Sequence, residues 1–307
     1  MKKIKQWIFF LDLDGTVLAK SSTSEIHPKV IDGVKRLREA GHIVCIATGR
    51  PWRATIKAYN TLSLDTIVAN YNGAQIHNPS DYNFVPDFSY LNLNDVLYIL
   101  GDEKLESSIK NKAIEGVGWV QLEKRDEALE RVFGFTDAPK FKVGIYTNKL
   151  PLKPCGAIVD LKESVDVVEL LDYLQRKYGD LVEFSSWSKG EGLTPVVDIT
   201  DIGVKKSRAV SLISRYYDIP IERTVSIGDG YNDVPMFKTT EISVAMSNSN
   251  QEVKDNATFI TQKDNKEAGL VEFIDKFLGD NSKEFIKEQT SIRRKKHYLK
   301  EQTTVAH

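Results

Sequence analysis

The chain has 307 residues, of which 41% are hydrophobic and 28% charged, and its formal net charge is -1. These values are typical of a folded chain that is long enough for two domains, and the near-zero charge predicts no general attraction to nucleic acid or to an anionic membrane. The basic start resembles a signal peptide, but Asp12 and Asp14 interrupt the apolar run after it. The two cysteines, Cys45 and Cys155, cannot form a disulfide framework, so we expect a cytoplasmic location.

The first predicted element is a strand over residues 7–11, an apolar run too short to cross a membrane and typical of a strand buried on both faces. Asp12, Asp14 and Gly15 follow it. The two carboxylates lie two positions apart, on one side of the chain, and the glycine permits a tight turn. Neighbouring anions usually require a cation, a shared proton or a developing charge. The alternative is a plain turn at Asp14-Gly15-Thr16.

A strand and helix rhythm follows the opening strand. We predict a helix over 28–40, a strand over 43–47, a helix over about 51–62 and a strand over 66–69. The short links between them predict a parallel sheet wrapped by helices. In such sheets ligands bind at the carboxyl ends of the strands, and Thr48 and Asn72 lie at two of these ends.

The pattern changes near Ala74, where residues 74–77 and 83–85 flank a turn-rich stretch and predict a hairpin. Beyond it we predict helices over 94–101 and 165–178 and strands over 141–147, 157–161, 181–185 and 195–199, with a weakly patterned stretch before 139. This mixed, partly antiparallel pattern predicts an inserted domain over about 78–200. Residues 187–192 suit either a substrate-facing loop or a solvent-exposed turn, and we favour the turn.

The first rhythm returns after Gly203. We predict a helix over 206–217, strands over 225–227, 242–245 and 258–260, a helix over 251–256 and an amphipathic helix over 267–278. One α/β core is therefore expected from residues 1–77 and 201–280, with the inserted domain between them. Residues 281–307 are polar and contain four consecutive basic residues, 293–296, and we expect a solvated or partly helical tail.

Four carboxylates follow two of the predicted buried strands: Asp12, Asp14, Asp229 and Asp233. No cysteine or histidine accompanies them at ligand spacing, and an all-oxygen cluster favours a hard cation such as Mg2+. Lys206 adds a fixed positive charge near this cluster. Such a site suits phosphoryl transfer, which requires positioning and charge neutralisation. One carboxylate could attack phosphorus while another protonates the leaving oxygen.

Three segments carry a family resemblance: FLDLDGT at 10–16, ATGR at 47–50 and GDGYND at 228–233. Together with a lysine that opens a late helix and a large insertion before it, they resemble the haloacid dehalogenase (HAD) superfamily. The insertion point, the turn at 72–74 and the segment SVAM at 243–246 are similar to the Cof-type phosphatases with a C2 cap. The resemblance covers about 4–78 and 200–279, and it implies a Rossmann-like, HAD-like core with an inserted α+β cap domain.

The resemblance also implies roles for individual residues. Asp12 is similar to the nucleophile that forms an aspartyl-phosphate, and Asp14 to the acid that protonates the leaving group and then activates water. The implied metal site consists of Asp12, the carbonyl of Asp14, Asp229 and, in support, Asp233; the implied phosphate site consists of Thr48, Gly49, Lys206 and Asn232. Lys205 is a rival of Lys206, but the family's Gly-Val-x-Lys spacing favours the second lysine. Arg50 fits the family tripeptide, although a surface or salt-bridged arginine would explain it equally well.

We therefore predict a Mg2+-dependent phosphohydrolase that releases phosphate from a small phosphorylated metabolite: a sugar phosphate, a nucleotide or a phosphorylated cofactor. The cap would close over the site and exclude water. Two alternatives stay open at this point, a phosphomutase of the same architecture and a non-catalytic sensor of phosphorylated ligands. The expected partner is a small phosphate ester, with no nucleic acid and no membrane, and the chain is expected to be a monomer or a homodimer.

Overall fold

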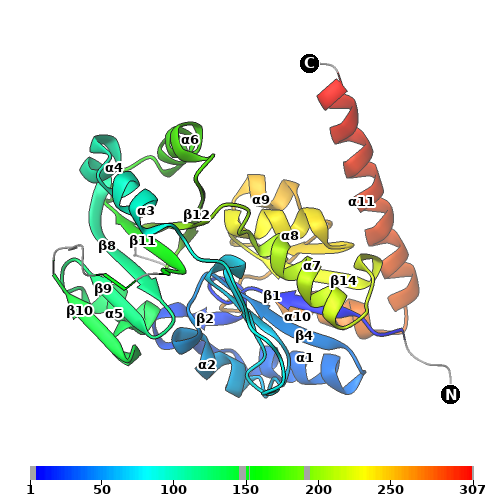
Figure 1. Cartoon of the computed structure of the whole chain (residues 1–307). Helices are drawn as coiled ribbons and strands as arrows, with labels where there is room; N and C mark the ends of the chain where they lie inside the picture. The colour runs from blue at the N-terminus through cyan, green and yellow to red at the C-terminus, as the bar shows by residue number, and fades with distance from the viewer. Residues whose placement is uncertain (1–4, 145–149, 152, 190–193, 306–307) are drawn as a thin grey trace.

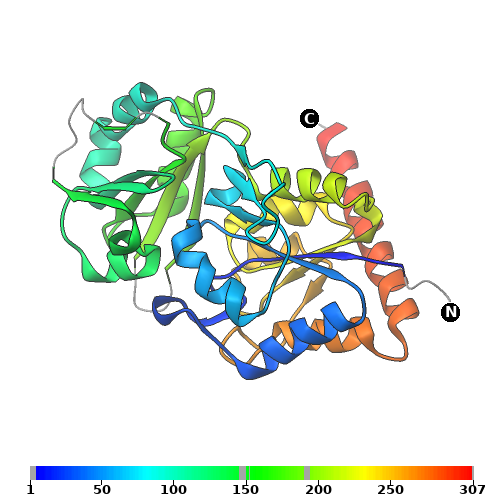
Figure 2. The same ribbon diagram turned by 60° about the horizontal axis from the view of Figure 1, so that its bottom comes forward.

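Two β-sheets organise the computed structural model, which describes residues 5–144, 150–151, 153–189 and 194–305. The larger sheet is built from both ends of the chain and the smaller one from its middle (Figures 1 and 2). We call the unit around the larger sheet the core and the unit around the smaller sheet the cap. Within the described ranges, no helix is both long and apolar enough to span a membrane.

The core sheet has the strand order β16-β15-β14-β1-β4-β5-β6-β7. Its strands are β1 (Ile8–Leu11), β4 (Ile43–Ala47), β5 (Val68–Asn70), β6 (Gln75–His77), β7 (Asp87–Phe88), β14 (Thr224–Gly228), β15 (Ile242–Ala245) and β16 (Phe259–Ile260); β2 (Leu18–Lys20) and β3 (Glu25–Ile26) form a separate hairpin. The strands from β16 to β5 are parallel to one another. β6 pairs antiparallel with β5, and β7 pairs antiparallel with β6. Leu11 pairs with both Ile46 and Ile227, so β1, β4 and β14 end at the same edge. The predicted Rossmann-like core is confirmed.

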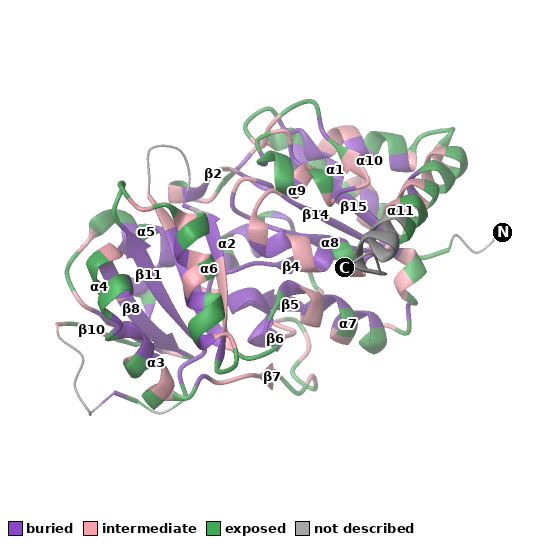
Figure 3. Ribbon diagram, turned by 90° about the horizontal axis from the view of Figure 1, so that it is seen from above, coloured by how far each residue is buried: buried purple, intermediate pink, exposed green. Residues whose placement is uncertain are grey.

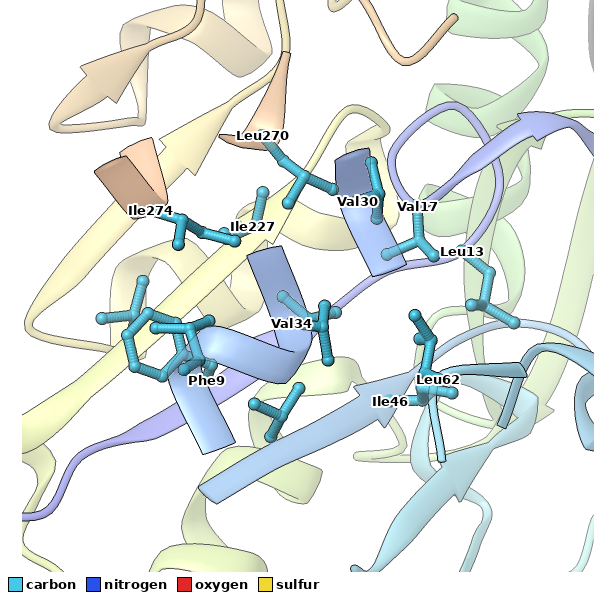
Figure 4. Packing of buried hydrophobic residues seen from close by; sticks show 14 of the residues in the cluster. Phe9, Leu13, Val17, Val30, Val34, Ile46, Leu62, Ile227, Leu270 and Ile274 are labelled. Atoms are coloured by element: carbon cyan, nitrogen blue, oxygen red, sulfur yellow. The ribbon is translucent and has the colours of Figure 1, made fainter. Parts of the chain in front are cut away.

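Helices cover both faces of the core sheet. They are α1 (Pro28–Glu39), α2 (Trp52–Thr61), α7 (Lys206–Tyr216), α8 (Val234–Thr239), α9 (Gln251–Asp255) and α10 (Leu270–Leu278). Because successive strand residues point to opposite faces, Phe9 belongs to a cluster with Val34 of α1 and Ile274 of α10 (Figure 4). Phe10 belongs to a second cluster, with Ile213 of α7. This double burial explains the continuous apolar run of β1.

The cap sheet has the strand order β10-β9-β8-β11-β13-β12. Its strands are β8 (Ile109–Gly116), β9 (Trp119–Leu122), β10 (Lys140–Val143), β11 (Gly156–Leu161), β12 (Val182–Ser188) and β13 (Pro195–Asp201), and its helices are α3 (Leu93–Leu100), α4 (Glu103–Ser108), α5 (Glu127–Phe133) and α6 (Val167–Tyr178). Helices α3, α4 and α6 cover one face, and α5 packs on part of the other. Figure 3 shows both sheets largely buried, with exposed sides on the outer helices.

The structure corrects two predictions in the middle of the chain. The second strand of the predicted hairpin is β7 rather than 83–85, because Asn78 and Asp81 hold the chain before it in side-chain-bonded turns. Since β7 joins the core sheet, the predicted insertion of 78–200 contains one core strand. The weakly patterned stretch before 139 forms α4, β8, β9 and α5, and charged residues hide the alternation in β8. The predicted strand over 141–147 extends beyond the described residues, which stop at 144.

The predicted polar tail is a long helix, α11 (Ser282–Val305), and is more regular than we expected. Its first turns pack on the core, where the Phe285 ring contacts Phe259 and Phe273. Basic residues also anchor it, since Arg293 pairs with Glu241 and Lys296 donates to a backbone carbonyl of the core. The later turns point away from the body of the molecule (Figure 1).

Candidate active site

Three carboxylates from two adjacent strands meet at the carboxyl edge of the core sheet. Asp12 follows β1, and Asp229 and Asp233 follow β14. Each of the three offers an oxygen that lies within 4.8 Å of the others. The parallel pairing of β1 and β14 produces this convergence, and the backbone N–H of Asp12 extends it by donating to the carbonyl of Ile227 at 3.0 Å.

Lys206 begins α7 and is completely buried beside these carboxylates. Its Nζ lies 2.6 Å from Asp12 Oδ1 and 2.5 Å from Asp233 Oδ1. Burial and the charge of Asp233 raise the pKa of Asp12 to about 7 although Lys206 opposes them, and burial with Asp12 and Asp233 raises the pKa of Asp229 well above its usual value. One ammonium among three carboxylates leaves an excess of negative charge that a divalent cation would compensate.

Further hydrogen bonds hold the two acidic loops. The hydroxyl of Thr16 donates to Asp229 Oδ1 at 2.9 Å, and Asn248 Nδ2 donates to Asp229 Oδ2 at 3.2 Å. Asp233 Oδ2 accepts from the backbone N–H groups of Asp229 and Gly230, both at 2.9 Å. Thr16 and Asn248 could not be identified from the sequence, because neither residue type signals a metal site.

Gly15 should be irreplaceable at this site. Its φ is +70°, and a Cβ there would lie 2.1 Å from Asp229 Oδ2. Gly15→Ala must therefore displace Asp229 and should weaken Mg2+ binding at least about tenfold in isothermal titration calorimetry. Gly41→Ala is the matched control, because Gly41 has a similar φ of +85° and no atom within 4 Å of its Cβ position. Equal Mg2+ affinity in the two variants would contradict the prediction.

Arg50 forms a buried salt bridge with Asp14. Of the interpretations given above, the structure therefore supports a salt-bridged arginine. Its Nε lies 2.7 Å from Asp14 Oδ2 and its Nη2 lies 2.6 Å from Asp14 Oδ1. The guanidinium also donates to the carbonyls of Ser21 and Ala54, so it is fixed by the fold. The two hydrogen bonds from Arg50 fix the orientation of the Asp14 carboxyl group.

The residues predicted to bind phosphate lie against the acidic cluster. A cavity of about 10 Å³ is lined by Asp12, Asp14, Thr48, Gly49, Trp187, Asp229, Gly230 and Asn232. Asn232 Nδ2 donates to Asn72 Oδ1 at 3.1 Å, and Asn232 Oδ1 is buried without a partner among the described residues. The structure thus brings all the predicted site residues together, with Lys206 and Asp233 beside the cavity. The cavity has room for about one water molecule.

Trp187 lines this cavity, although we favoured a solvent-exposed turn for 187–192. Its indole packs on the ring of Phe133 at a centroid distance of 5.3 Å, and its Nε1 donates to Asp198 Oδ2 at 2.7 Å. Lys189 is also buried, and it forms an ion pair with Asp160. The prediction is wrong for Trp187 and Lys189, because the packing of Trp187 comes from α5, which the sequence pattern did not reveal. Residues 190–193 lie outside the described part of the chain.

A larger cavity of about 230 Å³ lies between the cap and the core beside Asn232. Phe184 and Ser185 of β12 line it from the cap, and Lys206 and Tyr231 line it from the core. Asn232 borders both cavities, so this space lies next to the acidic site. Its size suits the organic part of a small ester.

Comparisons with known proteins agree with this geometry. A sequence model described as haloacid dehalogenase-like hydrolase matches residues 9–274. A candidate phosphatase of Metamycoplasma hominis is 53% identical over 89% of this chain and 97% of its own length. The 5-amino-6-(5-phospho-D-ribitylamino)uracil phosphatase YitU of Bacillus subtilis is 30% identical over 89% of this chain and 98% of its own.

Solved structures share the fold. SMU.1108c of Streptococcus mutans superimposes with a TM-score of 0.72 at 22% identity, over 90% of this chain and 99% of that one. A haloacid dehalogenase-like hydrolase from Bacteroides thetaiotaomicron gives a TM-score of 0.67 at 21% identity, over 89% of this chain and 100% of that one. The sequence match over most of the chain, the shared fold and the acidic edge of the core sheet agree: this chain belongs to the haloacid dehalogenase-like hydrolases, among their phosphatases.

Proposed function

We propose that this chain is a Mg2+-dependent phosphatase that releases phosphate from a small phosphorylated metabolite through an aspartyl-phosphate on Asp12. The observation that carries the proposal is the arrangement of Asp12, Asp229 and Asp233 around the buried Nζ of Lys206. The cavity that Thr48, Gly49 and Asn232 complete lies directly beside these groups. Carboxylates, an ammonium and amide donors in one place can hold a dianionic phosphoryl group only together with a cation.

The donor set fits Mg2+. Three carboxylates offer oxygens within 4.8 Å of one another, and one ammonium leaves their charge incompletely neutralised. Asp12, Asp229 and the carbonyl of Asp14 would hold the ion, and Asp233 would orient Lys206 and the loop amides. When bound, Mg2+ would neutralise charge on the phosphoryl oxygens.

Asp12, Asp14 and Lys206 each have a separate role in the proposed reaction. A carboxylate oxygen of Asp12 attacks phosphorus, the bond from phosphorus to the ester oxygen breaks, and Asp14 gives that oxygen a proton. In the second step Asp14 takes a proton from water, whose oxygen attacks phosphorus. The bond from phosphorus to Asp12 then breaks, which frees the Asp12 carboxylate and inorganic phosphate. Lys206 keeps Asp12 oriented throughout, and the two hydrogen bonds from Arg50 orient the carboxyl group of Asp14.

The class of substrate follows from the cavity and the relatives. A space of about 230 Å³ suits the organic part of a metabolite rather than a macromolecule. The Bacillus subtilis relative is named for a phosphorylated ribitylamino-uracil, which is an ester of this size class. The cytoplasmic location, the division into domains and the monomeric or homodimeric state stay predictions.

Phosphate release from sugar phosphates, nucleotides, flavin mononucleotide and pyridoxal phosphate tests the proposal. We expect turnover of at least one ester with Mg2+, its loss in EDTA and its recovery when Mg2+ is returned. No turnover by folded, Mg2+-loaded protein would contradict the proposal. Transfer of the phosphoryl group to a sugar hydroxyl with little free phosphate would instead identify the phosphomutase.

A further inference from the structure

Two buried carboxylates lie on the face of the cap sheet that is turned toward the active site. Glu115 is on β8 and Asp198 on β13, and they are only 1% and 5% exposed. Their neighbours Ile114, Val197 and Ile199 point to the opposite face, where they pack with α3 and α6. The alternation of side chains along a strand therefore directs Glu115 and Asp198 toward the core.

The two carboxylates line one small cavity between the cap and the core, of about 10 Å³. Gly49 lines this cavity and also the catalytic cavity that contains Asp12. A Cβ on Gly49 would lie 3.1 Å from Asp198 Oδ2 and 3.1 Å from Trp187 Nε1. Gly49, one of the residues predicted to bind phosphate, is therefore common to the two cavities.

The carboxylate oxygens that line this cavity are only partly paired, although the Tyr71 hydroxyl also lines it and opposes the rise in the pKa of Glu115 through a hydrogen bond. Asp198 Oδ2 already accepts from Trp187 Nε1 at 2.7 Å and from Asn72 Nδ2 at 2.8 Å. One carboxylate oxygen of Glu115 is bound by Arg53 of α2, but the other, Oε1, is buried and has no partner among the described residues. Burial raises the pKa of both carboxyl groups, that of Asp198 to about 7. A buried acceptor left without a donor is costly, so the arrangement suits a donor that arrives from outside.

We propose that Glu115 and Asp198 form a leaving-group subsite that accepts a hydrogen bond from a hydroxyl or an amine of the substrate. The subsite rests on the proposed phosphatase function, because it selects which ester is cleaved. The cavity has room for about one such group, and the position beside Gly49 places that group close to the phosphate. A donor to a buried carboxylate makes a charge-assisted hydrogen bond, whereas an alkyl group would leave Glu115 Oε1 unpaired.

Matched esters test the subsite. Sorbitol 6-phosphate and n-hexyl phosphate share a six-carbon chain with and without hydroxyl groups, and 2-aminoethyl phosphate and ethyl phosphate form the corresponding pair for an amine. The wild-type enzyme should have a higher kcat/KM for the donor-bearing member of at least one pair. Glu115→Gln replaces the free acceptor by a donor and should reduce that preference about 10- to 100-fold, with little change for the alkyl ester.

Two further variants keep the result interpretable. Asp198→Asn can keep both of its hydrogen bonds through its amide oxygen, and it should also reduce the preference. Glu130→Gln is the control, because Glu130 is a buried cap carboxylate paired with Arg125 and lines neither cavity. An equal loss for both esters of a pair, an unchanged preference, or no preference in the wild type would overturn the subsite and leave it filled by water.

A binding measurement distinguishes failure of the subsite from failure of the phosphatase proposal. If the wild type hydrolyses none of the four esters, calorimetric titration of the same esters into the Mg2+-loaded Asp12→Asn variant, with and without Glu115→Gln, decides the subsite alone. Weaker binding of the donor-bearing ester to the double variant would support the subsite. Equal affinities would overturn it.

Discussion

Replacing Asp12 by asparagine should lower phosphate release at least about 1000-fold while the protein stays folded. The side chain keeps its shape and can still accept the hydrogen bond from Lys206 Nζ, which lies 2.6 Å from Asp12 Oδ1. An amide does not form the acyl-phosphate, so the first step is lost. Phosphate release at saturating ester and Mg2+ measures the effect, and residual activity above about a tenth of the wild type would place the nucleophile elsewhere.

The same substitution should not destabilise the metal-free protein. Asp12 is buried among Asp229, Asp233 and one ammonium, so removing its charge relieves repulsion between carboxylates. We expect the thermal midpoint of Asp12→Asn in EDTA to equal or exceed that of the wild type. Asp32→Asn is the control for a carboxylate removed from the exposed side of α1, where it pairs with Arg36, and it should change neither activity nor midpoint appreciably.

The core was predictable because its signals are local. An apolar run such as β1 followed by Asp12 and Asp14 specifies both a buried strand and the side chains at its end. The second run, β14, has the same form and ends before Asp229. Since parallel strands carry their ends to one edge, two local patterns were enough to predict the acidic cluster without knowledge of the packing.

The cap side of the site could not be predicted for a physical reason. Trp187, Glu115 and Asp198 come from three strands that meet only through the register of the cap sheet. Glu115 and Asp198 each neighbour an apolar residue of the cap interior, and Trp187 lies between two serines, so the position of each in the sequence does not distinguish an active-site face from an outer face. The pairing of Arg50 with Asp14 is similar, because a span of 36 residues between the partners leaves no local pattern.

Lys206→Met should have the second large effect, on stability as well as on activity. It removes the cation that lies between Asp12 and Asp233, and leaving buried carboxylates without their partner costs about 3–5 kcal/mol of the free energy of unfolding. Urea denaturation in EDTA measures this loss. The neighbouring Lys205→Met is the matched control, because Lys205 is half exposed and pairs with Glu183 across 3.0 Å, so it should cost at most about 1 kcal/mol.

Added Mg2+ separates the effect of Lys206 on stability from its proposed effect on catalysis. Without the ammonium, the carboxylates attract a divalent ion more strongly, so saturating Mg2+ should raise the thermal midpoint of Lys206→Met by more than that of the wild type. Activity should stay low even then, because the ion replaces the charge beside Asp12 but not the hydrogen bond from Lys206 Nζ that we propose orients the nucleophile. Recovery of both stability and turnover in Mg2+ would restrict Lys206 to a structural role, and a loss of both in Lys205→Met instead would reverse the assignment of the two lysines.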